Sequence, residues 1–422
     1  MVALISSHNR GHDLCTFAAS RLEGFFMHYS DTIQRLSESA TLAMARKSRE
    51  LKEQGVDVIS LSLGEPDFNT PDFIKEAAIE AIHANYSKYP PVNGYPEVRK
   101  AISNKFKRDN GLDYSPEQIV VSTGAKQSIT NVVLAIVSKG DEVLLPAPYW
   151  VSYEEIVKLA NGIPTVIKTG IESDFKITAA ELESAITPRT RMMIFSTPCN
   201  PTGSVYSKEE LEALAEVLAR YPDVYVICDE IYEHINFEAK HESLAQFASI
   251  YDRVITVNGV SKAFAMTGWR IGYIGAAEWI AKACSKIQGQ VTSGACGIAE
   301  KAAQAAVEAS PDVTKEMVAQ FKDRRDFMIS RLKEIPGIRV NHPEGAFYIY
   351  PEMSAFLGRS YKGEVINTTS ELTEFLLEHA HIAFVAGEAF GTPGYLRISY
   401  AASMEELRKA TDRLEQGLAL LS

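Results

Sequence analysis

Cysteine is scarce in this sequence and shows no paired arrangement. The five cysteines stand at positions 15, 199, 228, 284 and 296. An odd number without a Cys-x-x-Cys pair predicts neither a disulfide framework nor a zinc site. Long hydrophobic runs are lacking too, since no stretch approaches the roughly 18 apolar residues that a membrane helix needs. We therefore expect a cytoplasmic protein without a structural metal.

An excess of positive charge is also absent. The chain has 43 Lys+Arg against 54 Asp+Glu, a formal net charge of -11. This balance argues against non-specific binding to nucleic acid or to anionic membranes, but it leaves room for a local basic pocket. Residues 1–26 have neither the apolar core of a secretory signal nor the arginine bias of a transit peptide. For this segment we expect a disordered extension.

The remaining pattern is that of an α/β protein. Of the 422 residues 46% are hydrophobic, enough for two or three domains with cores of their own. Several predicted strands are continuous apolar runs, which indicates burial on both faces and hence a mostly parallel sheet between helices. The strands are expected at 118–122, 142–146, 164–168, 192–196, 224–228, 254–257 and 271–276, with helices at 125–137, 149–160 and 209–220.

A second, smaller α+β domain is expected after about residue 290. Helices are predicted over 299–309 and 313–332, and short strands follow around Ile338, Phe347 and Leu396. A helix predicted over 39–55 could pack with this domain. We therefore predict an N-terminal arm with part of the small domain at 27–72, a large domain at 73–298 and a small domain at 299–422.

Polar segments follow the predicted strands at the sheet edge where α/β proteins bind ligands. These segments are Ser122 to Lys126, Asn200 to Gly203, Asp229 to Tyr232, and Ser261-Lys262 followed by Arg270. A carboxylate at Asp229 suits a cationic nitrogen, and the alternative is a cap for the next turn. Lys262, among small and apolar neighbours, suits imine formation, and the alternative is a solvated surface charge.

Arg270 and the helix start at 124–126 suit a phosphate. A phosphate, a cationic ring nitrogen and an aldehyde-capturing lysine together match pyridoxal 5'-phosphate.

The motifs extend this match along most of the chain. Eight of them occur in order: Gly64-Glu65-Pro66-Asp67-Phe68, Tyr89-Pro90-Pro91, Gly124-Ala125-Lys126-Gln127, Pro148-Tyr149-Trp150, Asn200-Pro201-Thr202-Gly203, Asp229-Glu230-Ile231-Tyr232, Ser261 to Arg270, and Leu396-Arg397-Ile398-Ser399. From about Leu36 to the C-terminus the sequence resembles the fold-type I pyridoxal-phosphate enzymes. Within them it is similar to the class I aspartate aminotransferases of the bacterial aspartate/prephenate branch.

The resemblance implies a role for each matching residue. Lys262 would bind the cofactor aldehyde as an imine and then shuttle a proton as general acid/base, Asp229 would pair with the ring nitrogen, and Tyr232 would hydrogen-bond the phenolate oxygen. The implied cofactor-binding residues are Gly124, Ala125, Lys126, Trp150, Asn200, Asp229, Tyr232, Ser261, Lys262, Arg270 and Tyr89. Tyr89 would reach the cofactor of a neighbouring subunit, so the resemblance implies a homodimer with shared active sites.

The implied substrate-binding residues are Gly64, Lys126, Trp150, Asn200 and Arg397. Arg397 would hold the α-carboxylate, and Lys126 the distal carboxylate of aspartate or glutamate. The implied reaction converts L-aspartate and 2-oxoglutarate to oxaloacetate and L-glutamate by ping-pong kinetics. A solvent-facing lysine in a first helical turn is the alternative interpretation of Lys126.

The sequence differs from the family pattern at two places, and three alternative functions are considered. Gly259 stands where animal-type relatives carry a phosphate-binding serine. Relatives active on prephenate carry a lysine where this chain has Leu36-Ser37-Glu38-Ser39. The alternatives are an aminotransferase for aromatic or neutral amino acids or prephenate, a β-lyase, and a non-catalytic regulator. Nothing in residues 1–26 has the size or basic charge of a DNA-binding module, which disfavours the regulator.

Overall fold

The computed structural model describes residues 29–238 and 240–422. The predicted extension at 1–26 lies outside the described residues. Residues 37–422 form one compact unit, and a separate N-terminal unit contains the short helix α2 (Asp31–Arg35). None of the described helices is both long and apolar enough to cross a membrane.

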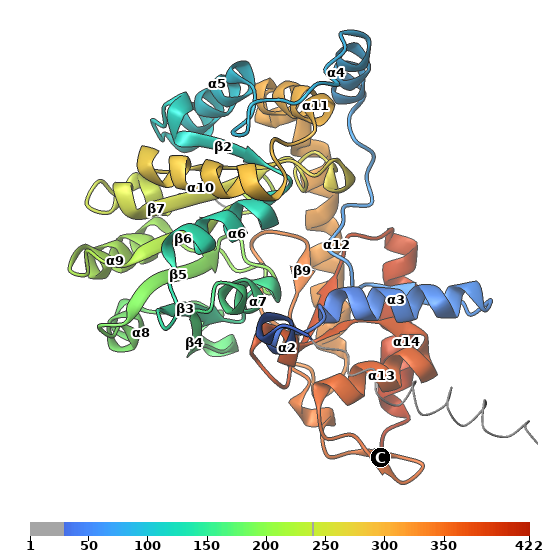
Figure 1. Ribbon diagram of the computed structural model, residues 1–422. Helices are drawn as coiled ribbons and strands as arrows, with labels where there is room; N and C mark the ends of the chain where they lie inside the picture. The colour runs from blue at the N-terminus through green and yellow to red at the C-terminus, as the bar shows by residue number, and fades with distance from the viewer. Residues whose placement is uncertain (1–28, 239) are drawn as a thin grey trace, which may run out of the picture. The chain divides into compact units, whose positions relative to one another are not determined.

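A seven-stranded sheet organises most of the compact unit (Figure 1). Its order is β2 (Ile119–Ser122), β8 (Gly272–Gly275), β7 (Val254–Gly259), β6 (Tyr225–Asp229), β5 (Thr190–Ser196), β3 (Glu142–Ala147) and β4 (Ile163–Lys168). Neighbouring strands are parallel except that β8 runs antiparallel to both β2 and β7. The predicted mostly parallel sheet is thus confirmed, and its strands lie within two residues of the predicted ranges.

The continuous apolar strands have hydrophobic clusters on both faces of the sheet. Met192 and Ile194 of β5 point into one cluster, and Met193 and Phe195 point into the other. The first cluster includes α6 (Ala125–Ile136), α7 (Ser152–Leu159) and α10 (Glu278–Val291). The second includes α4 (Asp72–His83), α5 (Pro96–Lys105), α8 (Ala179–Ala185), α9 (Lys208–Ala219) and α11 (Gly297–Glu308). Burial on both faces explains why these strands lack polar alternation.

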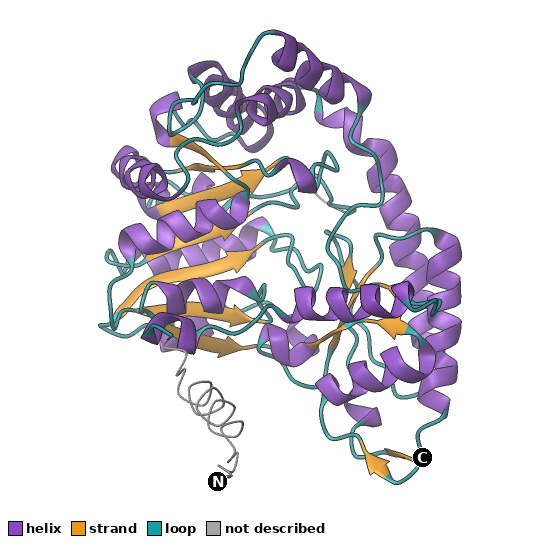
Figure 2. Cartoon of the chain, turned by 45° about the vertical axis from the view of Figure 1, so that its right-hand side comes forward, coloured by secondary structure: helices purple, strands orange, loops and turns teal. Residues whose placement is uncertain are grey.

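A third cluster surrounds a small antiparallel sheet of β13 (Val385–Ala386), β14 (Leu396–Ser399) and β9 (Tyr348–Ile349). The helices α12 (Lys315–Glu334), α13 (Thr369–Ala380) and α14 (Met404–Ala419) pack there (Figure 2). Two strand pairs complete the unit, β1 (Ile59–Ser60) with β12 (Ile382–Ala383) and β10 (Ser360–Tyr361) with β11 (Glu364–Val365).

The early helix α3 (Ala40–Glu53) packs with the later part of the chain, as the sequence indicated. Its Met44 joins a cluster with Val58, Leu377 and Ala383. After α3 the chain forms only a two-residue strand, because just Ile59 and Ser60 pair with β12. The domain boundaries near residues 72 and 298 stay predictions.

Candidate active site

A cavity of about 310 Å³ opens where the carboxyl ends of β5 and β6 meet the loops after β2 and β7. The small sheet and the start of α3 contribute its other walls. Of the predicted site residues, the cavity is lined by Gly64, Ala125, Lys126, Trp150, Asn200, Asp229, Tyr232, Ser261, Lys262, Arg270 and Arg397. Residues up to 333 positions apart in the sequence therefore meet at one sheet edge, as expected for an α/β ligand site.

Asp229 ends β6 and presents a buried carboxylate to the cavity. Its Oδ2 accepts a hydrogen bond from the Tyr153 hydroxyl at 2.7 Å, and its Oδ1 accepts one from the Ile231 amide at 3.3 Å. Burial raises the pKa of Asp229 to about 6, although both hydrogen bonds oppose the shift. No cationic side chain bonds this carboxylate within the described chain. A cationic nitrogen from a ligand would supply the missing charge.

Lys262 lies three residues beyond β7, with its ammonium inside the cavity. Its Nζ donates a hydrogen bond to the Gly64 carbonyl at 2.5 Å and lies 5.8 Å from the centre of the Tyr232 ring. Burial, aided by the nearby Arg397, lowers the pKa of Lys262 to about 8. About a tenth of this lysine would then be neutral at pH 7, far more than for an ordinary lysine. The site thus favours a nucleophilic amine.

Arg397 on β14 is a buried cation without a carboxylate partner among the described residues. It is 1% exposed, and its guanidinium donates hydrogen bonds to Asn200 Oδ1 at 3.0 Å and to the Ser62 carbonyl. The Tyr348 ring lies 4.7 Å from its Cζ, while its Nε has no hydrogen-bond partner in the described chain. A buried cation that binds only neutral groups is suited to accept an anionic ligand.

Tyr232 and Tyr348 pair through their hydroxyl groups beside Arg397. The two oxygens are 2.7 Å apart, and both side chains are buried. Burial raises the pKa of both phenols above the ordinary value. Both tyrosines are therefore neutral hydrogen-bonding groups at physiological pH.

The start of α6 and Arg270 form a narrow cradle. Gly124, the N-cap of α6, has φ +83°, and a Cβ there would lie 2.5 Å from Arg270 Nη2. A Cβ on Gly272 would lie 2.1 Å from the Ala125 nitrogen. Only glycine at these two positions lets Arg270 lie against Gly124 and lets Gly272 lie against Ala125. The Arg270 guanidinium therefore lies at the N-terminus of α6. This combination is suited to bind a phosphate, with Ser261 on the same cavity wall.

Lys126 and Trp150 lie together on the cavity wall. The Lys126 Nζ is 4.9 Å from the centre of the Trp150 ring. Desolvation and the neighbouring Arg270 lower the pKa of Lys126. Arg270, the charged group that acts on Lys126, is itself a cation and cannot neutralise the Lys126 ammonium. Lys126 is therefore available to bind an acidic ligand.

Two predicted residues do not line the cavity. Gly124 lies beneath Arg270, where it shapes the cradle. Tyr89 is 94% exposed, so it takes no part in the cavity of its own chain. A serine at Gly259 would crowd the sheet, because a Cβ there would lie 2.8 Å from the Ile271 carbonyl oxygen.

Sequence reasoning missed several cavity residues. They include Ser39, Thr41, Tyr153, Ser196, Thr267 and Tyr348. Tyr153 follows the predicted Trp150 by three residues, and this helical spacing was the one available signal. Tyr348 lies within an aromatic run in which nothing distinguishes a core residue from a site residue.

Known proteins are similar to this chain in sequence and in fold. Residues 56–414 match the family described as aminotransferase class I and II. A Rhizobium leguminosarum protein named "probable aspartate/prephenate aminotransferase" is 48% identical over 92% of this chain and 98% of its own. A Petunia hybrida protein named as a bifunctional aspartate aminotransferase and glutamate/aspartate-prephenate aminotransferase is 46% identical over 93% of this chain and 83% of its own.

Solved structures agree with these relatives. The aspartate aminotransferase of Rhizobium meliloti has a TM-score of 0.90 and 41% identity, covering 94% of this chain and 100% of that one. The Thermus thermophilus aspartate aminotransferase with maleate has a TM-score of 0.86 and 39% identity, covering 92% of this chain and 99% of that one.

Proposed function

The chain belongs to the class I and II aminotransferases, and we propose that it uses pyridoxal 5'-phosphate to move the amino group of L-aspartate to 2-oxoglutarate. Oxaloacetate and L-glutamate would be the products of a ping-pong cycle. We further propose that it acts in the cytoplasm as a homodimer. The observation that carries the proposal is the meeting of Lys262, Asp229 and Arg397 in one cavity.

The residues present fit this cofactor. Lys262 is a partly neutral amine for the aldehyde, and Asp229 is a buried carboxylate for the ring nitrogen. The helix start at Gly124-Ala125, with Arg270 and Ser261, would hold the phosphate. When bound, pyridoxal phosphate supplies an electron-withdrawing ring that stabilises negative charge at the substrate Cα.

The chain's own groups account for the remaining steps. Lys262, once displaced by the incoming amine, would carry the proton from the substrate Cα as general acid/base. Asn200 and Tyr232 would donate hydrogen bonds to the ring oxygen, and Trp150 would contact the ring face. Arg397 would fix the α-carboxylate and thereby orient the Cα–H bond toward Lys262.

A second group of residues supports a dicarboxylate substrate. Lys126 supplies a cation at the cavity wall, and Ser39 and Thr41 line the cavity at the start of α3. The Thr41 hydroxyl is buried without a hydrogen-bond partner in the described chain, so a ligand oxygen could satisfy it. The maleate bound by the Thermus relative is itself a dicarboxylate.

Replacing Lys126 tests this specificity. Lys126→Ala should lower kcat/KM for aspartate about 10–100-fold and change that for alanine less than about twofold, because one charge-assisted contact is lost. Arg397→Lys should instead weaken every amino donor, since the α-carboxylate is common to all. Lys282→Ala, a change at an exposed lysine of α10, is the control. Equal losses for aspartate and alanine in Lys126→Ala would remove Lys126 from substrate recognition.

Prephenate is the second candidate amino acceptor. Relatives up to 48% identical are named aspartate/prephenate aminotransferases, which favours it. The lysine found in prephenate-active relatives is missing from Leu36-Ser37-Glu38-Ser39, which argues against it. An assay with aspartate as amino donor and prephenate as acceptor, followed by chromatography of the products, shows whether prephenate is aminated.

A further inference from the structure

The segment from Asp229 to His234 has two sides. Asp229 and Tyr232 line the active-site cavity. Glu233 and His234, in contrast, line a separate cavity near α12. The turn is tight, since the Glu233 amide donates to the Glu230 carbonyl at 2.9 Å and the Ile235 amide donates to the Tyr232 carbonyl at 2.8 Å. A movement of Glu233 would therefore move Tyr232 as well.

A buried lysine binds the Glu233 carboxylate. Lys105, the last residue of α5, donates a hydrogen bond to Glu233 Oε1, and Asn110 Nδ2 donates to Glu233 Oε2 at 2.7 Å. The side chains of Lys105 and Glu233 are 2% and 3% exposed. Burial disfavours the Glu233 carboxylate, but Lys105 and His234 outweigh burial and hold its pKa well below the usual range.

A π-helical turn at Phe106–Asn110 presents this lysine to Glu233. In a π-turn residues five apart lie on one side, and Lys105 Nζ donates to Asn110 Oδ1 at 2.8 Å across this spacing. Both side chains then reach the two oxygens of one carboxylate. Such single-turn π-helices are frequent at functional sites.

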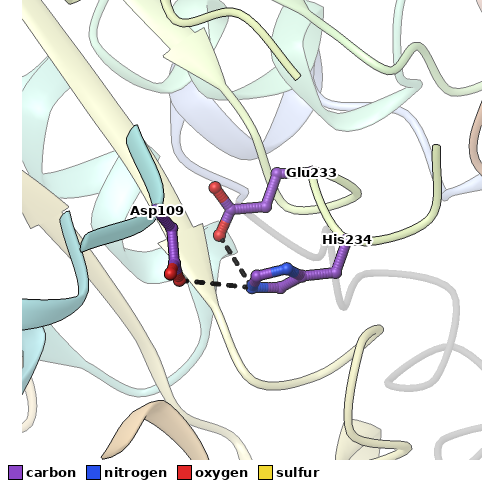
Figure 3. A group of neighbouring side chains, drawn as sticks. All are labelled: Asp109, Glu233 and His234. Carbon is purple, nitrogen blue, oxygen red and sulfur yellow. Dashed lines mark ion pairs between the residues drawn. The ribbon is translucent and has the colours of Figure 1, made fainter. Parts of the chain in front are cut away.

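Other charged groups complete the cluster (Figure 3). His234 Nε2 lies 3.2 Å from Glu233 Oε1 and 4.0 Å from Asp109 Oδ2, and Asp109 is also paired with Arg108. Glu230 accepts hydrogen bonds from Ser243 at 2.6 Å and from His241 at 3.0 Å. Asp109, Glu233 and His234 have the spacing of metal ligands, but the Lys105 ammonium already supplies the cation at Glu233.

We propose that the Lys105–Glu233 pair is a positioning device that fixes Tyr232 and Asp229 toward the bound cofactor. The proposal rests on the function proposed above and adds residues that touch neither cofactor nor substrate. Loss of Lys105 would leave the buried Glu233 carboxylate with only His234 and Asn110. Loss of Glu233 would leave the buried Lys105 ammonium with only Asn110 and the more distant Asp109, 3.9 Å away. Either loss is unfavourable, because a buried charge loses its closest partner. A Glu233 side chain without its closest partner would turn toward the cavity that it lines, and the backbone of Tyr232 would follow.

Three variants and one control test the pair. Lys105→Met and Glu233→Gln each remove one charge with little change of shape, and the double variant Lys105→Met/Glu233→Gln removes both. Lys107→Met is the matched control, because Lys107 lies on the same π-turn and pairs with Asp113 at the exposed surface. Each protein is loaded with pyridoxal phosphate, and the visible absorbance of the bound cofactor is titrated with pH.

We expect each single variant to shift the titration midpoint by at least about half a pH unit and to lower kcat about 5–20-fold, with KM for aspartate within about twofold. The double variant should return the midpoint toward the wild-type value, because neither member of the pair is left without the other. Lys107→Met should match the wild type in both measurements.

Other outcomes would contradict the positioning role of the pair. Single variants with a lowered melting temperature but an unchanged midpoint and kcat would show a structural anchor only. A double variant as shifted as the singles would show that charge compensation is not the cause. If one single variant does not fold, the other single variant and the double variant still decide the question. A wild-type protein that binds no cofactor would instead refute the proposed function.

Discussion

At the scale of single residues, the site depends on charges held without their ordinary partners. Among the described residues Lys262 contacts a carbonyl and aromatic rings, Asp229 contacts neutral donors, and Arg397 contacts an amide, a carbonyl and aromatic rings. In the described chain these three groups do not neutralise one another by direct pairing. Asp229 and Arg397 are therefore each available to a ligand group of the opposite charge, and Lys262 is available to an aldehyde.

The lowered pKa of Lys262 predicts how capture of the cofactor varies with pH. The neutral amine attacks the aldehyde, and with a pKa of about 8 its share rises about tenfold per pH unit below that value. The initial rate of cofactor capture by the cofactor-free protein should rise with this slope and level off above about pH 8. Stopped-flow absorbance measures the rate, and Lys262→Ala should show no capture. A rate that still rises steeply beyond pH 9 would indicate a lysine with its ordinary pKa.

At the scale of elements, the phosphate cradle depends on how closely β8 approaches α6. A Cβ at Gly272 would lie 2.1 Å from the Ala125 nitrogen, too close without backbone movement. Gly272→Ala should therefore raise the Kd for pyridoxal phosphate at least about tenfold and lower the melting temperature. Gly170→Ala is the control, since a Cβ there would meet nothing within 4 Å. Unchanged Kd in Gly272→Ala would show that the cradle tolerates displacement of α6.

The elements that carry the proposed cofactor-binding residues could be predicted from the sequence. The packing of side chains around those elements could not. Asp229 and Lys262 could be predicted because strand ends fix where such residues emerge, whatever the surroundings. Tyr153 and Tyr348 could not, because their roles depend on which way a buried aromatic ring points. The Lys105–Glu233 pair was also missed: it depends on a π-turn and on a contact 128 residues apart, and neither leaves a periodic signal.

At the scale of the whole molecule, we propose that Tyr89 reaches the active site of a second subunit. It is 94% exposed and lies outside the cavity of its own chain, which supports a role across a dimer interface. The protein should sediment at twice its chain mass of 46.5 kDa. The test of shared sites is to mix two weak variants, Tyr89→Ala and Lys262→Ala.

In a hybrid dimer one site receives its lysine from one chain and its tyrosine from the other. Equal mixing with subunit exchange should therefore restore about a quarter of the wild-type active sites. Activity no greater than the average of the two parents would place Tyr89 outside the partner's site.

A half-reaction titration measures whether the cavity converts aspartate with a lysine-bound cofactor. The protein is loaded with pyridoxal phosphate, and aspartate, alanine, phenylalanine and prephenate are added separately while the absorbance of the bound cofactor is followed. We predict that aspartate alone converts the cofactor to its amine form at low concentration, because Lys126 and Arg397 bind both of its carboxylates. Conversion by phenylalanine or alanine at lower concentration than by aspartate would refute the proposed specificity for aspartate.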